Sequence, residues 1–203
     1  MEMENSRGSS ITIHRQRKAR NMREIVELTK TLIRFKTRTP DTDELHHCAR
    51  YIQAWLDRYD VVYHRQDVAG IPSIWALPHT GRTKILLVTH FDVVNGPDTL
   101  FVPVEKDGML YGRGAVDDKY AVALSLVLFK NTLAALRRQS GGQADMSFGI
   151  LITGDEERRT RRRPRTSRGN AATHSKRADG DDSGTPLQGR QDPFSGSPGK
   201  NGP

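Results

Sequence analysis

The sequence predicts an α/β domain with a mixed, largely parallel sheet and helices on both faces. Two observations predict this class. Residues 85–88 and 146–153 are apolar runs with little polar alternation, as expected of strands buried on both faces. Longer segments with apolar residues at helical spacing lie before and between them. Strands that alternate with helices are typical of a sheet covered by helices.

Two helices are expected before the first strand. The first begins at Asn21, a possible cap with Glu24 three positions on, and ends before Pro40. The second begins at Asp41, with Glu44 in the equivalent position. Each helix carries an apolar stripe; the stripes are Met22, Ile25, Leu28, Leu32 and Phe35 in the first helix and Leu45, Cys48, Ala49, Ile52, Trp55 and Leu56 in the second.

The later elements follow from short apolar runs and one long stripe. Runs of apolar or β-branched residues separated by Gly, Pro and polar turns predict strands. The expected strands are residues 61–64, 73–77, 84–89, a pair within 101–111, and 146–153, and the long helix covers residues 118–136.

The character of the sequence changes after Glu157. Residues 158–203 hold 11 basic and 4 acidic residues, and the first 157 residues hold 21 basic and 20 acidic ones. Most of the net charge of +8 therefore belongs to this tail, which also has too few large apolar residues to offset the entropy of ordering. We expect a flexible arm at residues 1–20, a folded region at 21–157, and a basic, Gly/Pro-rich disordered tail at 158–203.

Composition also indicates the cellular compartment of the protein. The single cysteine excludes an internal disulfide. The longest apolar run, residues 121–129, is shorter than the ~18 residues that a membrane span requires. The first twenty residues lack the apolar block of a signal peptide. These features predict a cytoplasmic protein without a membrane partner.

Three motifs near the expected strand ends contain metal-binding residue types. His90 and Asp92 follow the strand 84–89 and project to the same side, so a carboxylate could orient the imidazole as a metal ligand. Asp117 and Asp118 stand where the long helix should begin. Residues 155–157 (DEE) follow the strand 146–153, and clustered carboxylates there need a dication or a catalytic role to offset their repulsion.

Each motif also has a simpler structural interpretation. The Asp pair could cap a helix, and the acidic triplet could be a solvated turn. Their joint position at strand ends, where open α/β sheets place the ligand crevice, favours a site for zinc, cobalt or manganese.

The three motifs together resemble a known family. Residues 88–94 (VTHFDVV), 110–119 (LYGRGAVDDK) and 151–157 (LITGDEE) are similar, in this order and spacing, to the zinc-dependent aminoacylase/carboxypeptidase family. That family includes acetylornithine deacetylase, succinyl-diaminopimelate desuccinylase and glutamate carboxypeptidases. The resemblance covers residues 21–157 and implies the N-terminal part of a catalytic domain, here truncated.

The resemblance implies a role for each motif residue. His90 matches a ligand of one metal ion, Asp117 a carboxylate that bridges two ions, and Glu157 a ligand of the second. Glu156 matches the general base that deprotonates water, and Asp92 matches the carboxylate that supports His90. The implied cofactor is zinc, with cobalt or manganese as alternatives, at two ions per site. The implied reaction is hydrolysis of an amide bond in a peptide or N-acyl amino acid.

The sequence departs from the family after Glu157. Family members continue with a further carboxylate ligand and a distal His ligand, and residues 158–203 resemble neither segment; Asp181 and Asp182 have no strand to hold them. A shifted reading frame or a truncated gene model would explain this. Three interpretations follow: an incomplete metal-dependent hydrolase, an inactive fragment, or a polyanion-binding module that uses residues 158–168. The tail lacks interleaved aromatics, so nucleic acid is not the expected partner. The resemblance implies a small peptide or N-acyl amino acid as substrate and, for the complete family, a homodimer.

Overall fold

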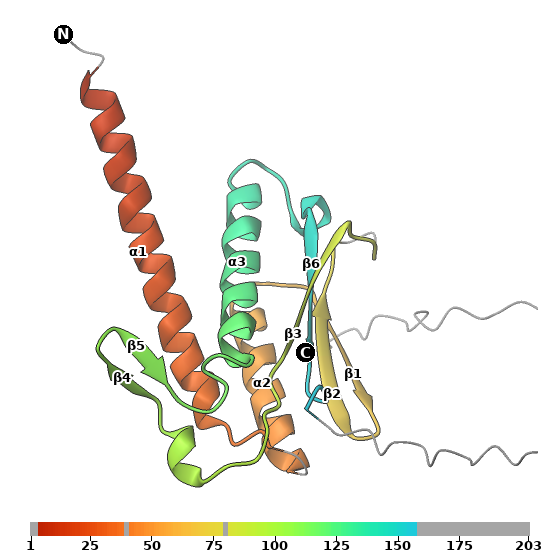
Figure 1. Ribbon diagram of the computed structural model, residues 1–203. Coiled ribbons are helices and arrows are strands. Elements are labelled where there is room, and N and C mark those ends of the chain that lie inside the picture. Colours follow the sequence, from red (N-terminus) through yellow and green to blue (C-terminus); the bar gives the residue numbers. More distant parts are fainter. Residues whose placement is uncertain (1–3, 39–40, 79–80, 158–203) are drawn as a thin grey trace, which may run out of the picture. The chain divides into compact units, whose positions relative to one another are not determined.

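The computed structural model describes the backbone of residues 4–38, 41–78 and 81–157, and side chains from residue 15 onward (Figure 1). The tail at 158–203 lies outside the described residues. The helices are α1 (Glu4–Arg34), α2 (Thr42–Arg58) and α3 (Lys119–Arg137), with 3-10 turns η1 (Asp98–Phe101) and η2 (Gln143–Asp145). The strands are β1 (His64–Val68), β2 (Ile71–Ala76), β3 (Ile85–His90), β4 (Val104–Lys106), β5 (Met109–Tyr111) and β6 (Phe148–Thr153).

Four strands form one mixed sheet in the order β1-β2-β6-β3. β3 and β6 are parallel, and α3 makes the crossover that parallel neighbours require. β1 pairs with β2, and β2 with β6, in antiparallel fashion. The predicted α/β class and mixed sheet are confirmed, but the parallel share is smaller than expected. β4 and β5 form a separate hairpin.

The helices lie on one side of the described sheet rather than on both (Figure 1). α2 packs on β2, α3 packs on β3 and β6, and α1 packs on α3. The expectation that residues 85–88 are buried on both faces was therefore wrong. β3 is an edge strand, and Ile85, Leu86 and Val88 are 56%, 43% and 60% exposed. An edge strand this apolar is a surface on which another strand can pair.

The hydrophobic core lies between the helices and the sheet. The predicted α2 stripe, from Leu45 to Leu56, is buried throughout. Ile74, Ile150 and Ile152 meet the helices from the sheet side. Cys48 lies within this core, and burial raises the pKa of its thiol to about 12. The stripe inferred from helical spacing therefore identifies the packed face of α2.

Most predicted elements are present, with two differences in boundaries. α1 begins at Glu4 rather than Asn21, so residues 4–20, expected as an arm, are helical. The strand expected at 61–64 begins at His64, because Val61 ends the turn after α2 and packs into the core. Asp41 caps α2 as predicted and accepts a hydrogen bond from the Glu44 N–H at 3.2 Å.

Among the residues that the structure describes, one helix, α3, is long and apolar enough to cross a membrane by length and composition alone. The helix continues beyond the apolar run at 121–129 because the apolar residues at helical spacing continue to Leu133. Eight of its residues are buried, and it packs on β3 and β6. These contacts are those of a core helix, and such helices pass the same test.

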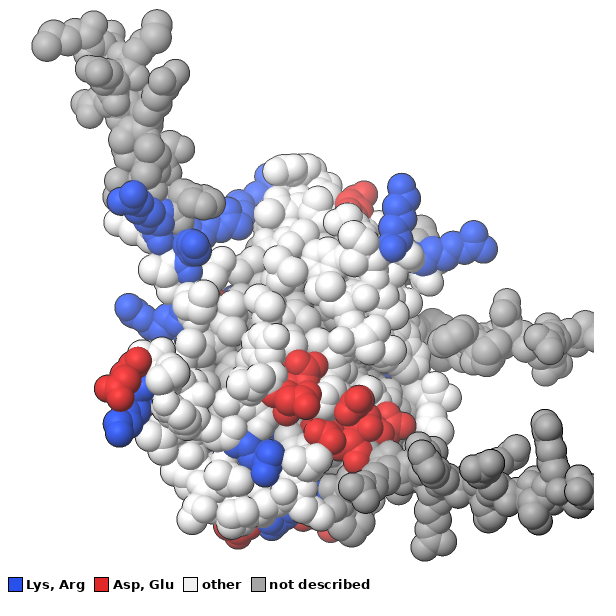
Figure 2. Space-filling view, in the orientation of Figure 1, with Lys and Arg blue, Asp and Glu red and all other residues white. Residues whose placement is uncertain are grey.

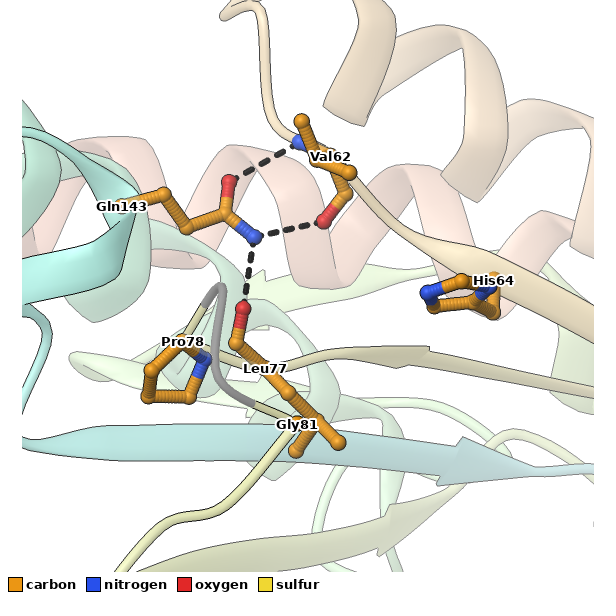
Figure 3. A pocket seen from close by; sticks show the side chains of 6 residues that line it. All are labelled: Val62, His64, Leu77, Pro78, Gly81 and Gln143. Carbon is orange, nitrogen blue, oxygen red and sulfur yellow. Dashed lines mark hydrogen bonds between the residues drawn. The ribbon is translucent and has the colours of Figure 1, made fainter. Parts of the chain in front are cut away.

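A small pocket at the end of the sheet opposite His90 has a structural explanation (Figure 3). The Gln143 amide donates to the carbonyls of Val62 and Leu77 and accepts from the Val62 N–H. His64 stacks on Trp75 with 5.6 Å between ring centroids. These hydrogen bonds connect η2 to the segments on either side of the first two strands. Because the amide of Gln143 is already hydrogen-bonded, it offers no free group for a ligand.

Candidate metal centre

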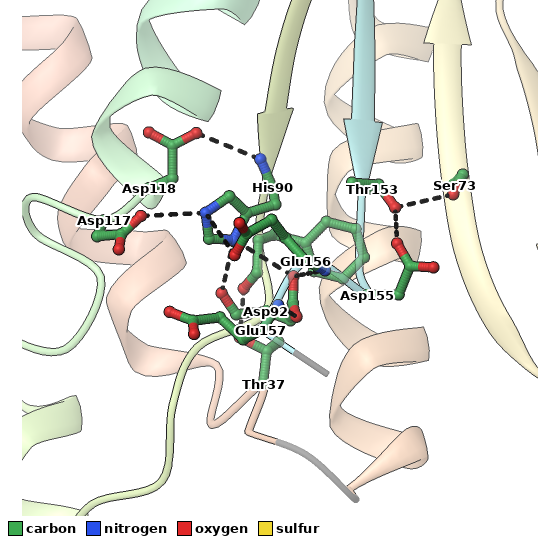
Figure 4. Close-up of polar contacts among 11 residues, drawn as sticks. Thr37, Ser73, His90, Asp92, Asp117, Asp118, Thr153, Asp155, Glu156 and Glu157 are labelled. Atoms are coloured by element: carbon green, nitrogen blue, oxygen red, sulfur yellow. Dashed lines mark hydrogen bonds and ion pairs between the residues drawn. The ribbon is translucent and has the colours of Figure 1, made fainter. Parts of the chain in front are cut away.

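His90 is the last residue of β3, and three carboxylates surround its imidazole (Figure 4). Its Nε2 lies 3.1 Å from Oδ1 of Asp117 and 3.8 Å from Oε2 of Glu156. On the other side, Nδ1 lies 3.1 Å from the carbonyl oxygen of Asp92 and 3.3 Å from its Oδ1. The side chain is 9% exposed, so the ring has a fixed place at the carboxyl edge of the sheet.

Asp92 connects two of the predicted motifs. Its carboxylate is fully buried and accepts the backbone N–H groups of Glu156 at 3.2 Å and Glu157 at 2.8 Å. The same carboxylate contacts Nδ1 of His90, so the buried side chain holds the imidazole and the turn after β6 together. A carboxylate behind a histidine fixes its tautomer and orientation. Asp92 therefore lies where the sequence predicted a supporting residue.

The Asp pair does not cap the helix that follows it. Asp118 occupies the N-cap position of α3, yet its side chain makes no cap hydrogen bond. Instead its Oδ2 accepts the backbone N–H of His90 at 3.3 Å, while Asp117 faces the imidazole. The peptide bond between the two residues is cis. The helix-cap interpretation is therefore wrong for Asp118, which ties the start of α3 to the end of β3.

The acidic side chains after β6 point in two different directions. Glu156 approaches Nε2 of His90, and its side chain is 60% exposed. Asp155 turns away and accepts a hydrogen bond from the Thr153 hydroxyl at 2.5 Å. Figure 2 shows acidic side chains gathered near the carboxyl ends of β3 and β6. Glu156 thus lies beside His90, and Figure 4 shows Glu157 near Asp92 in the same cluster.

The pKa values of His90, Glu157 and Asp118 are shifted by burial and by the charges of their neighbours. Burial disfavours charge on His90, but hydrogen bonding to Asp92 and the charge of Asp92, with Asp117, raise its pKa to about 9. Desolvation and the negative charges of Asp117 and Glu156 raise the pKa of Glu157. Desolvation also raises the pKa of Asp118. Excess negative charge around one imidazole is the environment that a divalent cation would neutralise.

The donor set fits a divalent metal in part. Nε2 of His90 and Oδ1 of Asp117 are close enough to share a cation, and imidazole with carboxylate suits zinc. Catalytic zinc usually takes three protein ligands. Across the described ranges, however, no group of three or more His, Cys, Asp or Glu side chains already has the arrangement of a metal site. The structure thus brings His90 and Asp117 together at the end of β3.

Two supporting residues were not predicted from the sequence. Thr37 is buried after α1; its hydroxyl donates to the Phe91 carbonyl at 2.5 Å, and its carbonyl accepts the Val93 N–H at 3.0 Å. Lys119 is fully buried and donates to the Phe35 carbonyl at 2.7 Å. Burial lowers the pKa of Lys119 to about 8. Lys119 is the first residue of an otherwise apolar helix, and this unusual position could have identified it as a supporting residue. The sequence around Thr37 contains no comparable signal.

Comparison with known proteins agrees with the motifs. The model of Peptidase family M20/M25/M40 matches residues 86–179, which include all three motifs. The succinyl-diaminopimelate desuccinylase of Bordetella parapertussis is 33% identical over 139 residues, 66% of this chain and 35% of the relative. The chain belongs to the M20 family. The same enzyme from Xylella fastidiosa is 32% identical over 142 residues, 67% of the M20 chain and 36% of the relative.

The fold of the M20 chain is also similar to a solved structure. Human carnosine dipeptidase 1 matches with a TM-score of 0.54 and 22% identity, over 71% of this chain and 34% of that one. The chain thus spans about a third of the length of the relatives it matches. The family match runs to residue 179, beyond the boundary expected at Glu157. Because residues 158–203 lie outside the described part, that boundary stays a prediction.

Proposed function

We propose that this M20 chain takes part in metal-dependent hydrolysis of an amide bond in a peptide or N-acyl amino acid. One observation carries the proposal: Nε2 of His90 faces Asp117 at 3.1 Å and Glu156 at 3.8 Å, while buried Asp92 holds the ring from behind. An oriented imidazole with a carboxylate beside it and a second one at the rim suits a metal ligand pair with a general base.

The residues divide into those that hold a metal and those that move a proton. His90 and Asp117 would hold one ion, and Asp117 and Glu157 a second; the remaining ligands would come from outside the described residues. Bound zinc would lower the pKa of a water molecule and polarise the scissile carbonyl. Glu156 would accept the water proton and return it to the leaving amine, because its exposed carboxylate can reach a substrate. Asp92 would keep Nε2 of His90 aimed at the site.

The relatives point to the substrate class. Two are named succinyl-diaminopimelate desuccinylases, and the similar structure is a dipeptidase. A substrate with an amide bond next to a carboxylate fits both names. We expect a cytoplasmic protein whose complete form is a homodimer that uses zinc, with cobalt or manganese as alternatives. Polyanion binding by the tail stays a prediction, because residues 158–168 lie outside the described part.

Replacing Glu156 by glutamine tests the proposed function. We expect hydrolysis to fall by about 10²–10⁴-fold, because the amide cannot take a proton, while zinc affinity changes little. The measurement is turnover of N-succinyl and N-acetyl amino acids and of dipeptides by the full chain, with zinc, cobalt or manganese and with a chelator. Asp155→Asn is the matched control, since the Asp155 carboxylate faces Thr153 instead of His90.

The alternatives predict different results. An inactive fragment gives no turnover with any of the three metals, although zinc still binds. Turnover that survives the chelator, or that Glu156→Gln leaves unchanged, contradicts the proposed mechanism.

A further inference from the structure

The N-terminal end of α1 extends past α3 (Figure 1), and residues 15–23, around the middle of the helix, form a cationic segment. The packed half of α1 is the last part, where Leu28, Leu32 and Ile33 are buried. Residues 15–20 are all exposed, as are Met22 and Arg23. At 1.5 Å per residue, the 31-residue helix is about 46 Å long. Arg17 and Asn21 line a groove with Ala135 of α3, so the cationic segment can meet a partner through the face that is turned away from α3.

Five cations crowd this segment without neutralisation. They are Arg15, Arg17, Lys18, Arg20 and Arg23, and the sequence places no acidic residue between Glu4 and Glu24. Within the described residues, none of the five forms an ion pair or hydrogen bond. In the packed part of the same helix, by contrast, Lys30 pairs with Glu27 and Glu105, and Glu24 pairs with Lys130. Figure 2 shows the resulting basic surface on the α1 side of the molecule.

The positions of the charges indicate the kind of partner. Arg15 and Lys18, Arg17 and Arg20, and Arg20 and Arg23 are three residues apart, so they are like-charged neighbours on the helix surface. With 3.6 residues per turn, the five side chains spread around the helix rather than along one stripe. Arg17 lies beside α3, and the other four cations occupy the remaining sides. The repulsion is relieved best by a partner that presents negative charge on both flanks of the helix.

We propose that the cationic segment of α1, residues 15–23, inserts its face away from α3 into the major groove of duplex DNA and binds the phosphate backbones on both sides. The B-form major groove is wide enough to admit an α-helix, whereas the major groove of A-form RNA is too narrow. An anionic membrane fits less well, because residues 15–23 include only Ala19 and Met22 as apolar residues and have no apolar face. No aromatic residue is available to stack on bases, so the contact is with phosphates and has no sequence preference.

This surface is distinct from both the metal centre and the tail. The sequence features that disfavour nucleic acid as a partner are those of residues 158–168, whereas residues 1–20 read as a flexible arm and not as a helix. Because residues 15–23 are helical, their five cations lie close together on one short helical segment. The inference does not depend on the proposed hydrolytic function.

The test compares two variants of the full chain with equal net charge. In the first, Arg15, Arg17, Lys18, Arg20 and Arg23 are changed to glutamine; in the second, Arg158, Arg159, Arg161, Arg162 and Arg163 are. Glutamine has a helix propensity close to that of arginine and lysine, and circular dichroism checks that α1 persists. Binding to a 20-base-pair DNA duplex is measured by fluorescence anisotropy between about 25 and 150 mM salt.

We expect the α1 variant to lose about 100-fold in affinity at 50 mM salt, with a slope of log affinity against log salt that is shallower by about 3–4. The tail variant should lose much less. The inference is overturned if the α1 variant binds as the unchanged chain does, or if both variants lose affinity equally. Equal or tighter binding to duplex RNA, or preference for phosphatidylserine vesicles over DNA, also overturns it.

Discussion

Changing His90 to alanine should weaken zinc binding by at least about 100-fold. Asp117 and Glu156 both approach Nε2 of the imidazole, so this nitrogen is placed to bind a cation together with their carboxylates. Without it, the remaining oxygen donors lack the ligand that favours zinc over magnesium or calcium. Loss of even a supporting residue commonly costs 10–100-fold in affinity, so loss of the ligand itself should cost no less.

Zinc affinity is measured by competition with a chromophoric chelator at several pH values. Because Asp92 and Asp117 outweigh burial and raise the pKa of His90 to about 9, zinc must displace a proton below that pH. Affinity of the unchanged chain should therefore rise by up to about tenfold per pH unit below pH 9. His64→Ala is the control, since His64 is on β1, at the opposite edge of the sheet from β3, and stacks on Trp75. Affinity that differs by less than about threefold between His90→Ala and this control would contradict the assignment.

Changing Asp92 to alanine should destabilise the fold by about 3 kcal/mol. Its buried carboxylate accepts the N–H groups of Glu156 and Glu157 and contacts Nδ1 of His90. Alanine leaves these donors without a partner, and each unsatisfied buried group costs about 1–3 kcal/mol. The turn after β6 should loosen as a result, and zinc affinity should fall by about 10–100-fold.

Unfolding by urea, followed through the fluorescence of Trp55 and Trp75, measures this loss. Asp92→Asn is the informative comparison, because one amide oxygen can still accept a backbone N–H while the negative charge behind His90 is gone. It should recover part of the stability but little of the zinc affinity. Asp155→Ala should be nearly neutral. Equal stability of the Asp92→Ala and Asp155→Ala variants would show that Asp92 does not hold the two motifs together.

The sequence predicts the local elements well because their signals are local. The stripe of α2 and its cap at Asp41 follow from spacing and residue type, and both are confirmed. The convergence of His90 and Asp117 follows from the general position of ligand sites at strand ends. The catalytic and metal-binding roles of the residues come from the family resemblance. The contacts of Asp92 with His90 and with the turn after β6 agree with a supporting role for this residue.

Other features depend on tertiary contacts that no local pattern encodes. The apolar run at 85–88 has the composition of a central strand, but β3 lies at the edge of the described sheet. Asp118 has the residue type of a helix cap, but the nearby N–H of His90 takes its carboxylate. The early start of α1 was missed because residues 4–20 have no apolar stripe. Thr37 bonds to residues 54 positions and more away.

The central claim is that imidazole and carboxylate from separate chain segments share a cation, and zinc anomalous diffraction from crystals of the full chain tests it most directly. The account predicts an anomalous peak within about 2.0–2.2 Å of both Nε2 of His90 and a carboxylate oxygen of Asp117. A peak elsewhere, or none between these two atoms at saturating zinc, would contradict it.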